Sequence, residues 1–296
     1  MQTGVTFFKQ EDADPDGLRG AAVAVIGYGN LGRSMALNLR DSGVDVVVGN
    51  IDDEYRSTAA ADGFEARGIA DAVAAADIVY LLIPDEVMDD VYADAVAPGL
   101  RAGDGICFAS GYALAYGLVS PPDDVDVLLL APRMLGEEVR HTYNRGEGFF
   151  TYVSVENDAS GSAWPRLLAL ASAVGSLRKG AMALSARQEA MLDLLIEQTV
   201  GPYLGTAIQI AYQLGTEAGL PAEAMVLEMY MSGEMSRTFQ TFAEEGFYRS
   251  TTWHGAVAQY GGFLRTLSLD REAMARHFSE TLEDISGGGF AARFEE

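Results

Sequence analysis

Short apolar runs rich in β-branched residues alternate with amphipathic segments over residues 1–180. The apolar runs have the length and composition of strands, and the segments between them have the apolar spacing of helices. The predicted strands are residues 23–26, 44–48, 78–83, 105–109, 125–131 and 152–155, and the predicted helices are residues 31–42, 53–61 and 86–95. Because apolar strands joined through helices are covered on both faces, this alternation predicts an α/β domain with a doubly wound, mainly parallel sheet.

The pattern changes near residue 185, where the strand-like runs stop. Apolar residues then recur three and four positions apart, which is the spacing of amphipathic helices. The segments with this spacing are residues 188–213, 222–245 and 271–285. We therefore place a domain boundary near Ala183 and expect an α/β domain over residues 1–183 and an all-helical domain over residues 184–296.

A glycine-rich turn follows the first predicted strand, in the sequence VAVIGYGNLG at residues 23–32. Gly27 permits a tight turn, Gly29 lets the backbone approach a pyrophosphate, and Gly32 allows close packing of helix on strand. The helix start adds N–H donors and the positive end of its dipole. The other predicted cofactor residues of the turn are Tyr28, Asn30 and Leu31. The turn, set between a strand and a helix, predicts a Rossmann-type domain that binds a nicotinamide cofactor.

The end of the second predicted strand should meet the adenosine ribose, so Asn50, Asp52, Arg56 and Ser57 are further candidate cofactor residues. Carboxylates bind a ribose diol and repel a 2′-phosphate, which favours NAD(H). Arg56 and Ser57 are groups that bind a 2′-phosphate, so NADP(H) stays open. The alternative is that the acidic residues here only begin a helix, where its dipole favours them.

Composition narrows the class of protein. Hydrophobic residues make up 49% of the 296 residues, which is ample for two packed domains. The longest apolar runs are too short to cross a bilayer, and the N-terminus lacks a signal-peptide pattern. The single cysteine, Cys107, excludes an intrachain disulfide and a cysteine-rich metal site. We expect a cytoplasmic protein with no membrane partner.

The net charge is −23, from 43 acidic and 20 basic residues. Nucleic-acid binding needs clustered Lys and Arg, so a nucleic-acid partner is not expected. The charge is typical of a strongly solvated acidic surface. The alternative is an acidic site for a cationic partner.

Ordered motifs extend over nearly the whole chain. They are FKQEDAD at residues 8–14, ALNLRDSGV at residues 36–44, IPDE at residues 83–86, FASG at residues 108–111, APR at residues 131–133 and DISGGGFA at residues 284–291. With the GYGxxG turn, they resemble the ketol-acid reductoisomerase family, the acetohydroxy acid isomeroreductases of branched-chain amino acid synthesis. The resemblance implies a Rossmann domain followed by an all-α, knotted C-terminal domain. It also implies that Pro84 and Ser110 lie beside the cofactor.

Asp193 and Glu197 are the best candidate metal ligands. Their four-residue spacing puts both on one helix face, where they interrupt an apolar stretch. The alternative is an ordinary exposed face. Their setting, DLLIEQ, resembles the family's DLFGEQ, whose Asp and Glu bind Mg²⁺. The resemblance also implies Glu228 as a ligand, but it places Ser232 where the family has a second glutamate. Mg²⁺ binding is therefore left open between a two-metal centre, one weaker ion and none.

Other positions also depart from the family pattern. Ser110 and Ala115 stand where the family has histidines, Arg133 replaces a lysine, and Gly255 replaces a substrate-binding serine. A guanidinium grips a carboxylate with two hydrogen bonds, so Arg133 is predicted to anchor an acid substrate. The alternative is a surface or pyrophosphate-neighbouring arginine.

Two further residues have open roles. His254, beside Trp253, is a candidate proton donor or substrate-orienting residue, or else a structural histidine. Tyr112 is predicted either to stack near the nicotinamide or to pack in the core.

These departures favour an NAD(P)H-dependent reductase of ketol-acid reductoisomerase-like fold, acting on a small keto acid or imine-bearing acid without the isomerisation step. One alternative is a genuine Mg²⁺-dependent ketol-acid reductoisomerase with an altered site. Another is a non-catalytic, NAD(P)-binding regulatory protein. The resemblance implies a homodimer or a larger homo-oligomer, in which helical domains of two chains complete each site.

Overall fold

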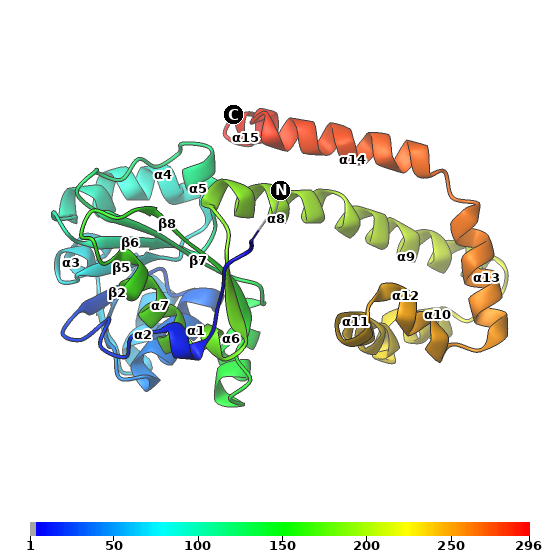
Figure 1. The fold of residues 1–296 in the computed structure, drawn as a ribbon, viewed down its shortest axis with the longest axis horizontal. Helices are drawn as coiled ribbons and strands as arrows, with labels where there is room; N and C mark the ends of the chain where they lie inside the picture. The colour runs from blue at the N-terminus through cyan, green and yellow to red at the C-terminus, as the bar shows by residue number, and fades with distance from the viewer. Residues whose placement is uncertain (1–3) are drawn as a thin grey trace. The chain divides into compact units, whose positions relative to one another are not determined.

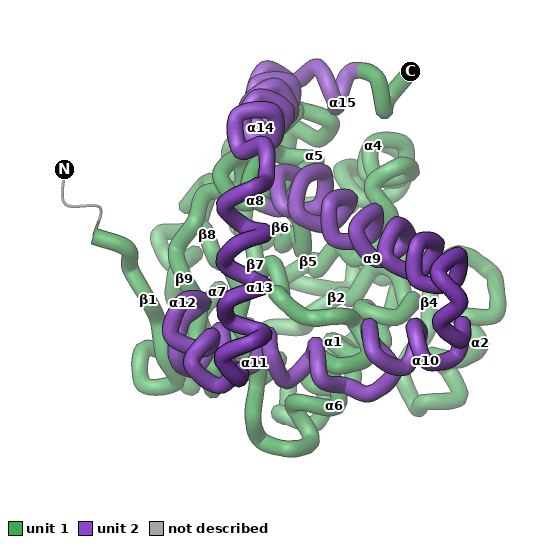
Figure 2. The backbone as a smooth tube through the Cα atoms, turned by 90° about the vertical axis from the view of Figure 1, so that its right-hand side faces the viewer, with its two compact units in different colours: residues 1–192, 293–296 green, residues 193–292 purple. Residues whose placement is uncertain are grey.

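The computed structural model describes residues 4–296, which divide into two compact units (Figures 1 and 2). Residues 1–3 lie outside the described residues. Unit 1 comprises residues 1–192 together with residues 293–296, and unit 2 comprises residues 193–292. The predicted boundary at Ala183 coincides with the end of the last strand, whereas the division between the units falls nine residues later, inside a helix that begins at Ala186.

Within the described residues of unit 1, nine strands form one sheet in the order β1-β9-β8-β7-β6-β5-β2-β3-β4. The strands are β1 (Phe7–Phe8), β2 (Ala22–Ile26), β3 (Asp45–Gly49), β4 (Glu65–Arg67), β5 (Ile78–Leu81), β6 (Gly105–Phe108), β7 (Asp126–Pro132), β8 (Phe150–Asn157) and β9 (Gly180–Ala183). β4, β3, β2, β5, β6 and β7 run parallel, while β8 pairs antiparallel with β7. The predicted mainly parallel sheet of a Rossmann-like domain is confirmed.

The helices of unit 1 connect these strands. They are α1 (Asn30–Asp41), α2 (Glu54–Ala61), α3 (Ile69–Ala74), α4 (Met88–Val91), α5 (Tyr112–Ala115), α6 (Gly136–Asn144), α7 (Ala163–Ala173) and α8 (Ala186–Gln198). The helix predicted over residues 86–95 is wrong as one regular helix: a 3-10 turn, α4 and a π turn at Tyr92–Val96 replace it. Pro98 has no N–H for the Asp94 carbonyl, so the regular helix cannot continue.

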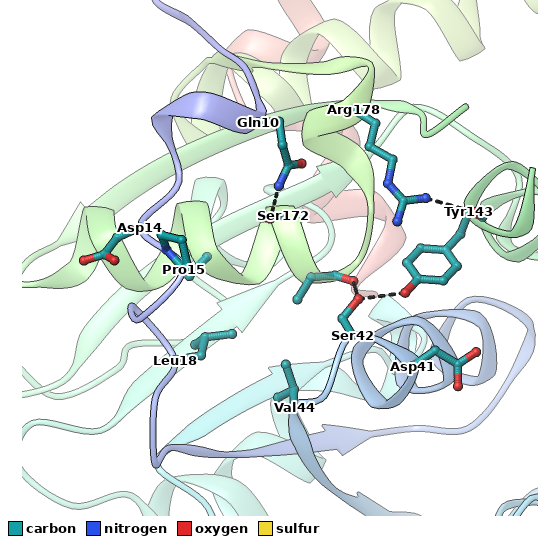
Figure 3. A pocket seen from close by; sticks show the side chains of 12 residues that line it. Gln10, Asp14, Pro15, Leu18, Asp41, Ser42, Val44, Tyr143, Ser172 and Arg178 are labelled. Carbon is teal, nitrogen blue, oxygen red and sulfur yellow. Dashed lines mark hydrogen bonds between the residues drawn. The ribbon is translucent and has the colours of Figure 1, made fainter. Parts of the chain in front are cut away.

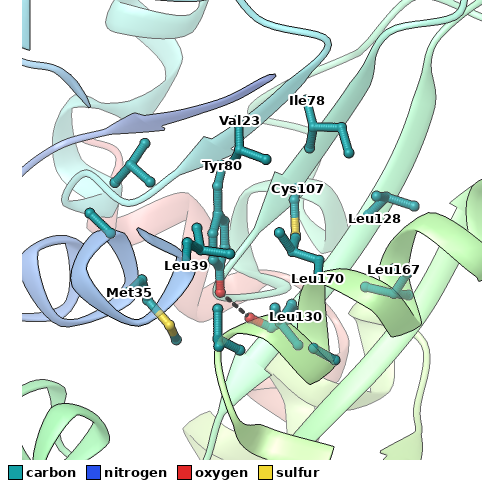
Figure 4. Packing of buried hydrophobic residues seen from close by; sticks show 14 of the residues in the cluster. Val23, Met35, Leu39, Ile78, Tyr80, Cys107, Leu128, Leu130, Leu167 and Leu170 are labelled. Carbon is teal, nitrogen blue, oxygen red and sulfur yellow. Dashed lines mark hydrogen bonds between the residues drawn. The ribbon is translucent and has the colours of Figure 1, made fainter. Parts of the chain in front are cut away.

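Alternate strand residues enter two apolar cores, one on each face of the sheet. Val23 and Val25 pack in the first core, and Ala24 and Ile26 in the second. Figure 4 shows the first core, where the buried Tyr80 hydroxyl donates to the Leu130 carbonyl oxygen at 2.8 Å. Cys107 packs in the same core, and burial raises the pKa of its thiol, as suits a small core residue. Strands apolar on both sides are what two covered faces require.

Unit 2 is helical, as predicted. Its helices are α9 (Val200–Glu217), α10 (Ala222–Val226), α11 (Glu234–Glu245), α12 (Phe247–Ser250), α13 (Ala256–Leu267) and α14 (Arg271–Ser286), and α15 (Gly289–Phe294) leads back to unit 1. No helix of the described residues is long and apolar enough to cross a membrane. The knotted path stays a prediction.

Two of the predicted helical segments are interrupted. The segment over residues 188–213 divides into α8 and α9, because Pro202 has no N–H for the Gln198 carbonyl. The segment over residues 222–245 is broken at Gly233, whose φ of +77° is left-handed. The break follows a π turn at Leu227–Met231.

Candidate functional site

A cavity of about 640 Å³ opens in unit 1 at the carboxyl ends of β2, β3 and β5. The chain leaves β2 toward β3 and returns to β5 on the other side of β2, so the strand order reverses between β5 and β2. In open α/β sheets, ligands bind outside the strand ends at such a reversal. The cavity therefore lies where a dinucleotide binds in this architecture.

The glycine turn forms one wall of this cavity. Gly27 has a φ of +93°, and a Cβ atom there would lie 2.5 Å from the Leu82 carbonyl oxygen. A Cβ atom at Gly32 would lie 2.0 Å from the Gly27 oxygen, so α1 begins in backbone contact with the turn. By contrast, a Cβ atom at Gly29 would meet no protein atom within 4 Å. Gly27 and Gly32 thus serve packing, and Gly29 leaves room for a ligand.

The loop after β3 forms the adjoining wall through a chain of hydrogen bonds. The Tyr28 N–H donates to Asn50 Oδ1 at 3.0 Å, and Asn50 Nδ2 donates to Asp53 Oδ1 at 2.7 Å. The Asp53 carboxylate also caps α2 by accepting the N–H groups of Tyr55 and Arg56. For Asp53 the structure therefore supports the helix-start interpretation, because this carboxylate stabilises the first turn.

Most predicted cofactor residues line the cavity, and four do not. Those that line it are Gly27, Tyr28, Gly29, Asn30, Leu31, Asn50, Pro84 and Ser110. Gly32 lies behind the turn. Asp52 is 97% exposed and lies 4.0 Å from the Arg56 guanidinium, and the Ser57 hydroxyl donates to the Asp53 carbonyl. These last three residues are outside the cavity lining.

The sequence prediction missed several apolar lining residues. Ile51, 63% exposed, and Tyr55, 47% exposed, border the cavity beside Asn50. Ligand cavities are lined mainly by apolar and aromatic side chains, and these two residues fit that pattern. An isoleucine between Asn50 and Asp52 was a usable signal, because apolar residues are uncommon in an otherwise polar loop.

A buried carboxylate, Glu189 of α8, holds the loop after β6. Glu189 is fully buried, accepts the Gly111 N–H at 2.7 Å and accepts Arg133 Nη2 at 2.8 Å. A Cβ atom at Gly111 would lie 2.1 Å from the Ala186 carbonyl oxygen, so α8 packs directly on this loop. The preceding residue, Ser110, lines the cofactor cavity. Arg133 was predicted as a site residue from the sequence, whereas Glu189 was not, although it lies four residues before Asp193 on the same helix.

Tyr112 is a buried packing residue. It is 5% exposed, its hydroxyl donates to Glu295 at 3.3 Å, and its ring meets Phe294 edge to face. Burial and the Glu295 carboxylate raise the pKa of this hydroxyl to about 12. Of the two predicted roles, packing is the one the structure supports.

The candidate metal ligands lie on two helical segments. Asp193, half-buried, and Glu197, exposed, are one turn apart on α8, and Glu228 is exposed in the π turn at Leu227–Met231. The Ser232 hydroxyl accepts the Glu234 N–H at 3.2 Å. Among residues 4–296, one chain groups no three His, Cys, Asp or Glu side chains so that they could hold a metal ion. Asp193 and Glu197 fit Mg²⁺ as oxygen ligands on one face, but a single chain does not add Glu228 to them.

His254 lies in unit 2, exposed, beside a small cavity of about 130 Å³ that Trp253 and Glu234 also line. The Trp253 indole N–H donates to Glu245 at 2.9 Å. The proton-donor role of His254 stays a prediction.

A second cavity of about 400 Å³ in unit 1 lies apart from the site and shares no lining residue with it (Figure 3). Its polar groups are largely bonded to one another: Gln10 donates to Ser172 at 2.6 Å, and the Ser42 and Tyr143 hydroxyls are 2.8 Å apart. Arg178 donates to the Tyr143 carbonyl at 2.9 Å. Because its polar groups already bond to one another, we assign no function to this cavity.

Comparisons with known proteins agree over both units. Residues 17–180 match the model of the acetohydroxy acid isomeroreductase NADPH-binding domain, and residues 187–296 match that of the ketol-acid reductoisomerase C-terminal domain. The chain is 40% identical to a putative ketol-acid reductoisomerase 3 of Saccharolobus solfataricus over 258 residues, which are 86% of this chain and 78% of that protein. It is 37% identical to a ketol-acid reductoisomerase (NADP⁺) of Renibacterium salmoninarum, over 97% of this chain and 84% of that protein.

Solved structures give the same result. The NADH-preferring ketol-acid reductoisomerase of an uncultured archaeon superimposes with a TM-score of 0.92 at 30% identity, over 98% of this chain and 89% of that one. A semialdehyde dehydrogenase NAD-binding protein of Cupriavidus necator superimposes with a TM-score of 0.70 at 19% identity, over 90% and 98% of the two chains. The second likeness shows the fold alone.

The substitution Glu189→Gln tests the buried carboxylate. It keeps the side chain's size and removes the charge opposite Arg133, which is 25% exposed. We expect the free energy of unfolding to fall by about 2 kcal/mol, less than the cost of breaking a fully buried pair. Urea unfolding of the full chain measures this, with Glu65→Gln in an exposed pair as the control. An unfolding curve like that of the unchanged protein would contradict the role given to Glu189.

Proposed function

The chain belongs to the ketol-acid reductoisomerase family of NAD(P)H-dependent oxidoreductases, and we propose that it catalyses the family's two-step reaction, isomerisation and reduction of an acetohydroxy acid. The observation that carries this proposal is that both domain models match, one of them over the helices that bear Asp193, Glu197 and Glu228. Family membership removes the non-catalytic alternative. The comparisons give no support to the predicted loss of isomerisation, and they fit the genuine reductoisomerase better.

The reaction moves an alkyl group from C2 of the substrate to C3, while the C2 hydroxyl loses its proton and becomes a ketone and the C3 carbonyl becomes a hydroxyl. A hydride and a proton then reduce the new ketone to a dihydroxy acid. Bound nicotinamide supplies the hydride, and bound Mg²⁺ supplies a Lewis acid. Asp193 and Glu197 would hold the metal. The Glu189–Arg133 pair fixes Gly111, and so fixes Ser110 beside the cofactor cavity.

Arg133 does not act alone as the anchor of an acid substrate, because its guanidinium is bonded to Glu189. The Glu189 carboxylate offsets the positive charge of Arg133. We therefore propose that a bound metal, rather than Arg133, is the main binding group for the substrate carboxylate. The second candidate, reduction without isomerisation, rests on Ser232. A serine removes one negative charge from the metal-binding set, which weakens Mg²⁺ binding, and reduction of a ketone needs less Lewis-acid help than an alkyl shift.

We propose NADH as the preferred cofactor. Among the described residues, no Lys, Arg or His lines the cavity, whereas Asp53 and Asp85 do. Arg56 lies beside Asp52. A 2′-phosphate would therefore meet carboxylates and no cation in the lining. The NADH preference of the archaeal relative supports the same choice, although the matching domain model is described as NADPH-binding.

We also propose that a second copy of the chain completes the metal site. One chain does not group Glu228 with Asp193 and Glu197. None of the 18 residues of α9 is buried, although this helix carries Ile210 and Leu214, which are 51% and 59% exposed. Leu267 of α13 is 85% exposed. A helical unit that exposes so many apolar side chains needs a partner surface.

Substrate tests separate the two reactions. With NADH and Mg²⁺, the reductoisomerase is expected to consume NADH both with 2-acetolactate and with the 3-hydroxy-2-keto acid in which the methyl group has already migrated. A reductase without isomerisation consumes it only with the second. Asp193→Asn should abolish turnover of the first substrate. Absence of NADH consumption with both compounds would contradict both candidates.

Cofactor preference is tested by comparing KM for NADH and NADPH. We expect KM for NADH to be lower, and Asp53→Asn, which keeps the helix cap, to shift the ratio toward NADPH by roughly tenfold, equal to about 1.4 kcal/mol. Asp45→Asn, at the opposite end of β3, is the control that should leave the ratio unchanged. A lower KM for NADPH in the unchanged protein would overturn the preference.

Sedimentation velocity tests the second copy. The unchanged protein is expected to sediment with at least twice the mass of one chain. The double substitution Leu214→Glu and Leu267→Glu should lower that mass and reduce turnover together. The control is Leu135→Glu in unit 1, where the side chain is 79% exposed. A monomer with full activity would contradict the proposal.

A further inference from the structure

Tyr28 lies between the first two glycines of the turn, and its side chain contacts Phe64 and Asp62, which follow α2 in the chain. Tyr28 is 1% exposed, and its ring packs edge to face on Phe64 with centroids 5.8 Å apart. Its hydroxyl donates to Asp62 Oδ2 at 2.9 Å. Asp62 is the residue that ends α2. The phosphate turn is thus tied through one side chain to the far end of a neighbouring helix.

Asp62 also holds a cation. Arg33, the residue after the last glycine of the turn, donates to both carboxylate oxygens of Asp62, with Nε at 2.7 Å and Nη2 at 3.1 Å. The Arg40 guanidinium donates to the Asp62 carbonyl at 2.7 Å. Arg33 and the Tyr28 hydroxyl lower the pKa of Asp62, so the carboxylate stays charged. One carboxylate therefore joins the turn, the first turn of α1 and the end of α2.

The other end of α2 is tied to the same residue. The Tyr28 N–H donates to Asn50 Oδ1, and Asn50 donates to Asp53, which caps the start of α2. Tyr28 is thus linked to the start of α2 through its backbone N–H and Asn50, and it bonds directly to Asp62 at the end of α2 through its hydroxyl. Because the phosphate turn and the loop after β3 form adjoining walls of the cavity, these bonds set the separation of the two walls.

We propose that Asp62 is a positioning residue of the cofactor site. It fixes Tyr28, and with it the phosphate turn, against the C-terminal end of α2, and Arg33 holds the Asp62 carboxylate in place. Because NADH and NADPH share the pyrophosphate that the turn meets, loss of this link weakens the binding of both. The inference rests on the dinucleotide cavity alone and is independent of whether the substrate is isomerised.

A purely structural role makes different predictions. An exposed ion pair such as Arg33–Asp62, in which Arg33 is 52% exposed, contributes little to folding. If Tyr28, Arg33 and Asp62 only stabilise unit 1, their substitution lowers the melting temperature and leaves the dissociation constants for NADH and NADPH unchanged. The two dissociation constants themselves therefore separate positioning from stability.

The experiment measures Kd for NADH and for NADPH by fluorescence titration of the full chain without substrate. Tyr28→Phe removes only the hydroxyl and should raise both constants equally, by about threefold to tenfold, as for loss of one hydrogen bond. Asp62→Asn weakens the bonds from Arg33 and should also raise both constants, without changing their ratio. Adding Tyr28→Phe to Asp62→Asn should raise them by less than the product of the two single effects, because both substitutions act on the same link.

Glu65→Gln is the matched control, since it discharges a carboxylate paired with Arg67 on the adjacent strand β4. It should leave both constants unchanged. Constants within twofold of the unchanged protein for folded Asp62→Asn and Tyr28→Phe would overturn the proposal. If Asp62→Asn does not fold, Tyr28→Phe decides: unchanged constants in that variant also overturn it. Failure of the unchanged protein to turn over an acetohydroxy acid would contradict the proposed function and would not bear on the role of Asp62.

Discussion

The cofactor cavity depends on the contact between the backbone of α1 and the turn that follows β2. A Cβ atom at Gly32 would lie 2.0 Å from the Gly27 oxygen, and one at Gly136 would lie 2.8 Å from the Leu31 nitrogen. These contacts join backbone to backbone, so no side-chain rotation relieves a substitution. The start of α1 is consequently fixed from two sides, by the turn and by α6. Its N–H groups point from a rigid position, which is what binding of a pyrophosphate requires.

A second constraint, electrostatic rather than steric, fixes the wall after β6. Glu189 is buried and uses its two carboxylate oxygens on Gly111 and Arg133. The same helix carries Asp193 one turn further on, so α8 both positions the loop beside the cofactor and presents the first proposed metal ligand. Glu189 and the proposed metal ligand Asp193 are thus four residues apart on one helix.

The features that were predictable from the sequence are those encoded locally. The strand–turn–helix at Gly27 carries its own steric signature, and two covered sheet faces force continuous apolar strands. The strands β1, β4 and β9, at the edges of the sheet or next to an edge, are only two to four residues long and were missed. Arg133 was found, but its partner Glu189 was not, because a lone carboxylate in an amphipathic helix resembles an exposed one. The proposed grouping of Glu228 with Asp193 needs a second chain, which no local pattern encodes.

The charge of the chain links the two halves of the site. With a net charge of −23, the protein repels both an anionic cofactor and an acid substrate. On the cofactor side, the described cavity lining offers no cation, so in the proposed site the N–H groups and the dipole of α1 would meet the pyrophosphate, and a further phosphate would cost more. On the substrate side, the Arg133–Glu189 pair is neutral, so in the proposed reaction a bound metal would attract the substrate carboxylate. At the proposed metal site, Ser232 in place of a carboxylate would have two opposite effects. It would weaken metal binding, and it would leave a bound metal with one more unit of net positive charge to hold an acid substrate.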